Sequence, residues 1–196
     1  LPEPVSLESF FSHRPTDRQV WRAIIAFGRN TATYKFAFAA ALLETAKDGK
    51  DQIQMSDLAE PFSRQLCTHL AASPKQITTR LEGEKSFLSA CRKFNEGSLD
   101  LAELLEVTEK KGFVNVVEAF QNLPGMDERR FYSGDFRTGI TVHDGLLELA
   151  CAQDREDLFG EVEARWRMVE SAWNLGISQR HLRVDFDPAS EDLYLL

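Results

Sequence analysis

The fold is set by residues 16–47, which read TDRQVWRAIIAFGRNTATYKFAFAAALLETAK. Thr16 followed by Gln19 is the pattern of a capping box, and apolar residues then recur at helical spacing. A Gly-Arg-Asn-Thr break interrupts that spacing before a second, more apolar run begins. The stretch therefore predicts two buried helices, over about 16–28 and 34–47, that meet at a polar joint.

Further runs with helical spacing follow one another as far as Gly176, and the spacing then changes to the alternation typical of a β-hairpin. The predicted helices cover about 56–72, 87–94, 101–111, 113–120, 143–152 and 154–175, and the predicted hairpin strands cover 181–186 and 193–196. The polar stretch 126–139 predicts a loop with a little extended structure. We expect a mainly α-helical protein, an irregular multi-helix bundle with a short C-terminal β-hairpin. Residues 1–125 would form a helical subdomain and residues 126–196 a helical subdomain with the hairpin, and the two could pack as one domain.

The composition is that of an ordinary globular protein. The chain has 196 residues, 43% of them hydrophobic and 28% charged, which excludes a disordered or collagen-like chain. Lys and Arg number 23 and Asp and Glu number 31, so the formal net charge of -8 does not favour non-specific binding to phosphate. The three cysteines form no CxxC pair, which fits a reducing cytoplasm. The longest apolar stretch is about half of a membrane span, so we expect a cytoplasmic protein without membrane contact.

Residues 11–35 are an exception to this acidic balance, because five cations there face a single acid, Asp17. Three of the arginines are four residues apart and would form one stripe on a helix, and the joint adds side chains that can position phosphates. The pattern predicts a nucleic-acid-binding surface made by Arg18, Arg22, Arg29, Asn30 and Lys35. The alternative is a solvated helix face beside a polar turn.

The opening helices also carry a set of residues at fixed spacing: Trp21-Arg22, Phe27-Gly28-Arg29-Asn30, Ala32, Tyr34-Lys35-Phe36-Ala37 and Leu42-Leu43. This set resembles the N-terminal helical region of bacterial HNH endonuclease domain-containing proteins, over about residues 20–45. The resemblance implies a non-catalytic recognition or regulatory region, in restriction or phage defence, that precedes a separate nuclease module with a zinc-knuckle cysteine pair and an Asp-His core. Those motifs do not occur in this sequence, so the resemblance assigns no catalytic residue. A divalent metal is expected only in the nuclease module, and we expect no cofactor in this chain, which would be part of a longer protein.

His143-Asp144 indicates a different hypothesis, because this pair resembles the His-Asp of HD-type phosphohydrolases. In such a site a metal pair is held by a lone His, the adjacent His-Asp and a distant Asp on a helical scaffold. The lone His would be His69 or His13, and the distant acid would come from the C-terminal hairpin. An Asp that caps a helix beside a surface His explains the same pair without a metal.

The remaining candidate residues favour structural roles. Asp185 and Asp187 share one face of a predicted strand, a spacing that suits metal binding, but acidic residues also discourage edge-to-edge aggregation. Cys67, Cys91 and Cys151 lie on apolar helical faces, which predicts buried structural thiols. Trp166 and Trp173 are seven residues apart on one apolar stripe, as core residues are.

Three hypotheses on function follow. The leading one is the non-catalytic region of an HNH-type DNA endonuclease, in contact with nucleic-acid backbone through the Arg/Lys patch. The second is a helical protein-protein interaction or dimerisation module that binds no nucleic acid, and the third is an HD-type metal phosphohydrolase. The expected partners are accordingly DNA, another protein or a second copy of the chain.

Overall fold

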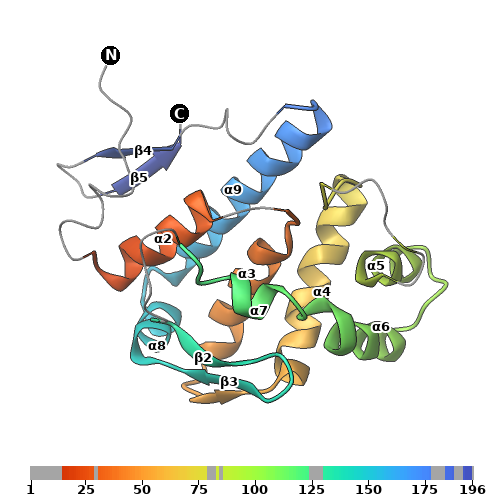
Figure 1. Cartoon of the computed structure of the whole chain (residues 1–196), viewed down its shortest axis with the longest axis horizontal. Coiled ribbons are helices and arrows are strands. Elements are labelled where there is room, and N and C mark those ends of the chain that lie inside the picture. The colour runs from red at the N-terminus through yellow and green to blue at the C-terminus, as the bar shows by residue number, and fades with distance from the viewer. Residues whose placement is uncertain are drawn as a thin grey trace.

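The structure is a computed structural model that describes residues 15–28, 31–78, 83, 86–123 and 130–177, together with the backbone of two later strands. The described chain is mainly helical, as predicted (Figure 1). The helices are α2 (Asp17–Phe27), α3 (Tyr34–Ala46), α4 (Met55–Ala72), α5 (Phe87–Asn95), α6 (Leu101–Val107), the π-helical turn η1 (Thr108–Gly112), α7 (Val116–Ala119), α8 (Asp144–Cys151) and α9 (Arg155–Asn174). The strands are β1 (Gln52–Ile53), β2 (Tyr132–Asp135), β3 (Gly139–Val142), β4 (Val184–Asp187) and β5 (Asp192–Leu195).

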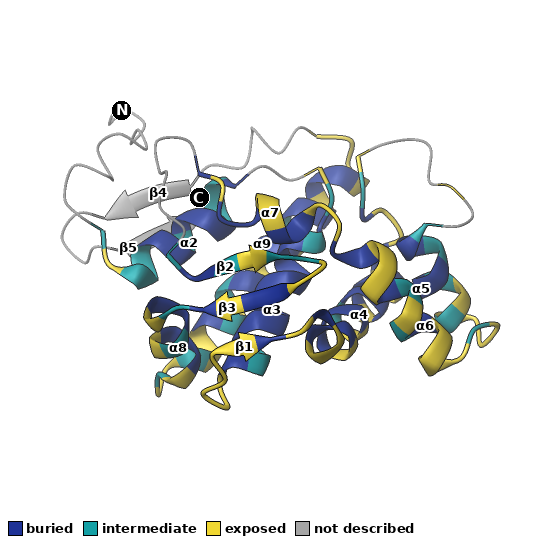
Figure 2. Ribbon diagram, turned by 60° about the horizontal axis from the view of Figure 1, so that its bottom comes forward, coloured by how far each residue is buried: buried dark blue, intermediate teal, exposed yellow. Residues whose placement is uncertain are grey.

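Helix α3 is the centre of the molecule. Every residue from Lys35 to Leu43 is buried, because this run is apolar on all sides apart from the lysine itself. Helices α4, α7, α8 and α9 all pack against it. Figure 2 shows α3 buried along most of its length, whereas α5 and α6 on the outside expose one face each.

The predicted capping box forms the start of α2, the helix that precedes α3. The Thr16 hydroxyl accepts a hydrogen bond from the Gln19 backbone N–H, and the Gln19 side chain accepts one from the Thr16 N–H. Helix α2 buries Trp21 against Phe120 and Phe131, with ring centroids 5.4 Å apart in both pairs. The first helix is therefore confirmed, together with its N-cap.

One hydrophobic core includes residues from before and after residue 125. Phe38 of α3 lies edge-on to Tyr132 of β2 at 5.9 Å, and Phe36 stacks on Trp166 of α9 at 5.9 Å. Trp166 and Trp173 are buried, as predicted for core residues. The two predicted subdomains thus share a core.

A three-stranded antiparallel sheet has the strand order β1-β3-β2. Strand β2 is the extended structure expected within the loop over 126–139, so that prediction is confirmed for its described part, and β3 begins at its last residue. Gly134 and Gly139 have positive φ values of 110° and 88°, which glycine adopts without strain. The predicted C-terminal hairpin is present as β4 and β5, with Val184 opposite Leu195. No helix in the described part of the chain is long and apolar enough to cross a membrane.

Candidate functional site

The two arginines of the predicted nucleic-acid surface that the structure describes both hold carboxylates. Arg18 Nη2 lies 2.5 Å from Asp154 Oδ1, just before α9. Arg22 donates from Nε and Nη2 to Glu161 of α9 at 3.0 and 2.6 Å, and its side chain is 17% exposed. These two ion pairs connect α2 to α9. Arg29 and Asn30 lie outside the described residues.

Lys35 does not reach the surface. Its side chain is 6% exposed, and Nζ donates to the carbonyl oxygens of Ile24, Ile25 and Gly28 at 2.9, 3.2 and 2.9 Å. These carbonyls are the C-terminal end of α2, where a helix leaves acceptors unpaired and carries partial negative charge. Lys35 therefore caps α2 from the first turn of α3.

A second cation that the sequence analysis missed lies at the same helix end. Arg165 of α9 donates from Nη2 to Ala26 O at 3.0 Å, whereas its Nε and Nη1 atoms have no hydrogen-bond partner among the described residues. Burial lowers the pKa of Arg165. Burial, followed by the positive charge of Arg165, also lowers the pKa of Lys35 well below its ordinary value.

Among the members of the predicted nucleic-acid surface that the structure describes, only Lys35 is buried. Arg18 and Arg22 are partly exposed, and each forms an ion pair with a partly exposed carboxylate. The sequence pattern could not show this, because the acceptors on α9 are more than a hundred positions away from the arginines. Nucleic-acid binding by the set remains a prediction.

A polar cleft with a volume of ≈ 530 Å³ lies between α4 and α9. Its lining includes Gln65, His69, Glu163, Arg167, Glu170 and Asn174. It brings together one histidine and two carboxylates that are far apart in the sequence.

His69 is held on both ring nitrogens. Nδ1 lies 2.9 Å from Glu170 Oε1 and Nε2 lies 2.9 Å from Glu163 Oε2, so each ring nitrogen contacts a carboxylate oxygen. The ring stacks on Trp166 with centroids 3.5 Å apart and planes 2° from parallel. Partial burial raises the pKa of Glu163, but the hydrogen bond from Arg167 and the charge of His69 outweigh it, so that pKa lies below its ordinary value.

The network continues into the interior. Gln76 Nε2 donates to Glu170 Oε1 at 2.5 Å, and Gln76 Oε1 accepts from Trp166 Nε1 at 3.0 Å and from the Thr33 hydroxyl. Thr33 belongs to the joint between α2 and α3, so buried hydrogen bonds connect that joint to α4 and α9. Because both nitrogens of His69 are engaged, the network acts as a clamp and presents no free base to a ligand.

A second groove, with a volume of ≈ 430 Å³, lies between α4, α5 and α6. Cys67, Phe94, Leu101 and Leu104 are among its lining residues, and Leu101 is 50% exposed. Cys67 and Cys91 are buried, which confirms two of the predicted buried thiols. Cys151 is exposed, so the prediction was wrong for it: it is the last residue of α8, where the apolar face of that helix ends.

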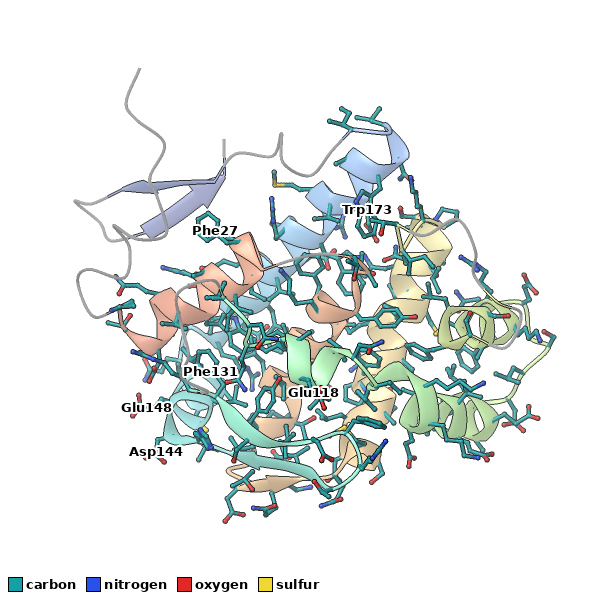
Figure 3. The ribbon with its side chains drawn as sticks, viewed as in Figure 1. Phe27, Glu118, Phe131, Asp144, Glu148 and Trp173 are labelled. Atoms are coloured by element: carbon teal, nitrogen blue, oxygen red, sulfur yellow. The ribbon has the colours of Figure 1, made fainter. Side chains whose placement is uncertain are left out.

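The parts of the predicted HD-type site do not converge in the described structure. His143 hydrogen-bonds Ser133 at 3.1 Å, and Asp144 and Glu148 are exposed on α8, away from α4 (Figure 3). Within residues 15–177 and outside their gaps, no three His, Cys, Asp or Glu side chains are grouped so as to hold a metal. His13 and the side chains of Asp185 and Asp187 lie outside the described residues.

Comparisons with known proteins add no relative. A scan against family models, a search of curated proteins and a search of solved structures each find no match to this chain.

Proposed function

We propose that this chain is a non-catalytic recognition or regulatory region of an HNH-type DNA endonuclease, of the restriction or phage-defence kind. The proposal starts from the resemblance of residues 20–45. The observation that carries it is the contact between two residues of the resemblance, Gly28 and Lys35, at one corner of the structure, defined here as the end of α2 and the start of α3.

The corner depends on more than apolar packing. A Cβ atom at Gly28 would lie 2.5 Å from Ile24 O and 3.0 Å from Lys35 Nζ, so a glycine makes room for the lysine that caps α2. Trp21 and Phe36 are fully buried on either side. A glycine in contact with a buried lysine is a more specific feature of this corner than a run of leucines would be.

In this proposal Arg18, Arg22 and Lys35 stabilise the fold. Arg18 and Arg22 are paired with carboxylates and Lys35 is buried, and the net charge of -8 does not favour a nucleic-acid surface elsewhere. Contact through these three side chains is not part of the proposed function. Contact of Arg29 and Asn30 with nucleic acid remains a prediction.

The reading frame that follows the codon for Leu196 tests the proposal. We expect it to continue into a segment with paired CxxC motifs and an Asp-His block, because the proposed activity needs a metal-binding nuclease module. A stop codon at that point, or a continuation into a different class of domain, would contradict the assignment.

A further inference from the structure

Two buried cysteines meet where α4 packs on α5. The Cys67 thiol donates a hydrogen bond to the backbone carbonyl oxygen of Cys91 at 3.9 Å, which brings the two cysteines into contact. Asn95 Nδ2 donates to Cys67 O at 2.8 Å, which fixes the end of α5 against the same turn of α4. The contact between the two cysteines is therefore held by the backbones of both helices.

The two thiols differ in access. Cys67 lines the ≈ 430 Å³ groove between α4, α5 and α6, and is 5% exposed. Cys91 lies behind it and is fully buried. A small uncharged oxidant that enters the groove meets Cys67 first.

The neighbouring thiol also prepares Cys67 for reaction. The hydrogen bond from Cys91 lowers the pKa of Cys67, and burial, which raises it, is the smaller effect. Since the thiolate is the nucleophile, a lowered pKa makes more of the reactive form.

We propose that Cys67 and Cys91 form a reversible disulfide when a hydroperoxide enters the groove between α4, α5 and α6. This site goes beyond the proposed function and does not depend on it. Cys67 reacts with the oxidant, and Cys91 resolves the product.

The reaction has two balanced steps. The Cys67 thiolate attacks one oxygen of hydrogen peroxide, the O–O bond breaks, and the departing hydroxide takes a proton to become water, which leaves a sulfenic acid on Cys67. The Cys91 sulfur then attacks Cys67 Sγ, the S–O bond breaks, and the hydroxyl group leaves with the Cys91 proton as a second water. The two thiols together lose two electrons, which reduce the peroxide, and a thiol reductant reverses the bond by exchange.

The disulfide would lock α5 to α4 across the groove. The two cysteines are 24 positions apart, so the bond closes a loop of that length and restricts the unfolded chain. For a domain of this size we expect oxidation to raise the thermal midpoint by roughly 5–10 °C.

The test uses the full chain with Cys151→Ser, so that no third thiol takes part. After brief treatment with hydrogen peroxide, we expect both remaining thiols to resist alkylation by N-ethylmaleimide, a peptide map to contain the Cys67–Cys91 cross-link, and dithiothreitol to restore both thiols. Loss of the thiols without that cross-linked peptide, or two thiols that stay reactive, would overturn the proposal.

Single variants in the same background assign the two roles. With Cys91→Ser, Cys67 should stop at the sulfenic acid and be captured by dimedone. With Cys67→Ser, oxidation of Cys91 should be slower by at least about tenfold, because the attacking thiol that lines the groove is gone. Equal oxidation of Cys91 with and without Cys67, in variants whose thermal midpoints show that they fold, would refute this order of reaction.

Discussion

A Lys35→Met variant is expected to lose about 2–4 kcal/mol of unfolding free energy in urea titration at neutral pH. Methionine keeps the length and volume of the side chain but donates no hydrogen bond, so the carbonyls of Ile24, Ile25 and Gly28 lose their common donor. Ile24 O keeps a hydrogen bond from the Gly28 N–H at 3.1 Å, so the cost comes mainly from the carbonyls of Ile25 and Gly28. Each buried polar group left unpaired costs about 1–3 kcal/mol. Methionine also removes the free-energy cost of burying an amine, but this gain offsets only part of the loss.

Lys50→Met is the matched control. The Lys50 side chain is 51% exposed and its Nζ lies 3.8 Å from Asp57 Oδ1, so its replacement should change stability by less than about 0.5 kcal/mol. A Lys35→Met protein as stable as the parent would mean that the desolvation cost of the lysine equals its capping contribution.

The same lysine makes stability depend on alkaline pH. Burial and the neighbouring Arg165 lower the pKa of Lys35 well below 10.5, so between the folded and the unfolded pKa the unfolded chain binds more protons. The unfolding free energy contributed by this group therefore rises with pH across that interval, and its full destabilising effect is present below the folded pKa. The Lys35→Met variant should lack this rise of unfolding free energy with pH. Urea unfolding midpoints of both proteins, measured from about pH 7 to about pH 10, test this.

A Glu170→Ala variant is expected to lose about 3 kcal/mol of unfolding free energy, which is the second large effect. Glu170 is 6% exposed and accepts from His69 Nδ1 at 2.9 Å and from Gln76 Nε2 at 2.5 Å. Removal of the carboxylate takes the acceptor from His69 Nδ1 and from one N–H of Gln76 Nε2, which keeps its other hydrogen bond to Ser73 O, and opens the clamp between α4 and α9. Urea unfolding of the full chain measures the loss.

Glu163→Ala is the control, because it contacts the other nitrogen of the same ring at the same 2.9 Å but from a side chain that is 39% exposed. Water can replace an exposed carboxylate as the partner of the ring nitrogen, so we expect a loss of unfolding free energy below about 1 kcal/mol. Equal losses for the two variants would show that burial does not decide the strength of the clamp.

Local sequence signals predicted the local structure well. The capping box of Thr16 and Gln19 and the apolar periodicity after it are complete within a few residues, and α2 begins where they indicate. The central position of α3 follows from a run that is apolar on all sides, and the same signal indicates that Lys35 inside it is buried.

The rest of the structure depends on contacts between residues that are distant in the chain. The partner of Arg22 is Glu161, 139 positions away, and the partner of His69 is Glu170, 101 positions away. Such pairs follow from how α4 and α9 pack on α3, which spacing within one helix does not contain. The contact between Cys67 and Cys91 is of the same kind.

The central claim is that the cations of the opening helices stabilise the fold. Its most direct test measures urea unfolding and a DNA gel-shift titration on the same Arg18→Ala, Arg22→Ala double variant, with Arg64→Ala, Arg167→Ala as the control for lost charge. The account predicts that the first variant loses about 1–3 kcal/mol of unfolding free energy, and that its DNA affinity at low salt stays within about twofold of the control. A loss of DNA affinity of about tenfold or more with unchanged stability would contradict it.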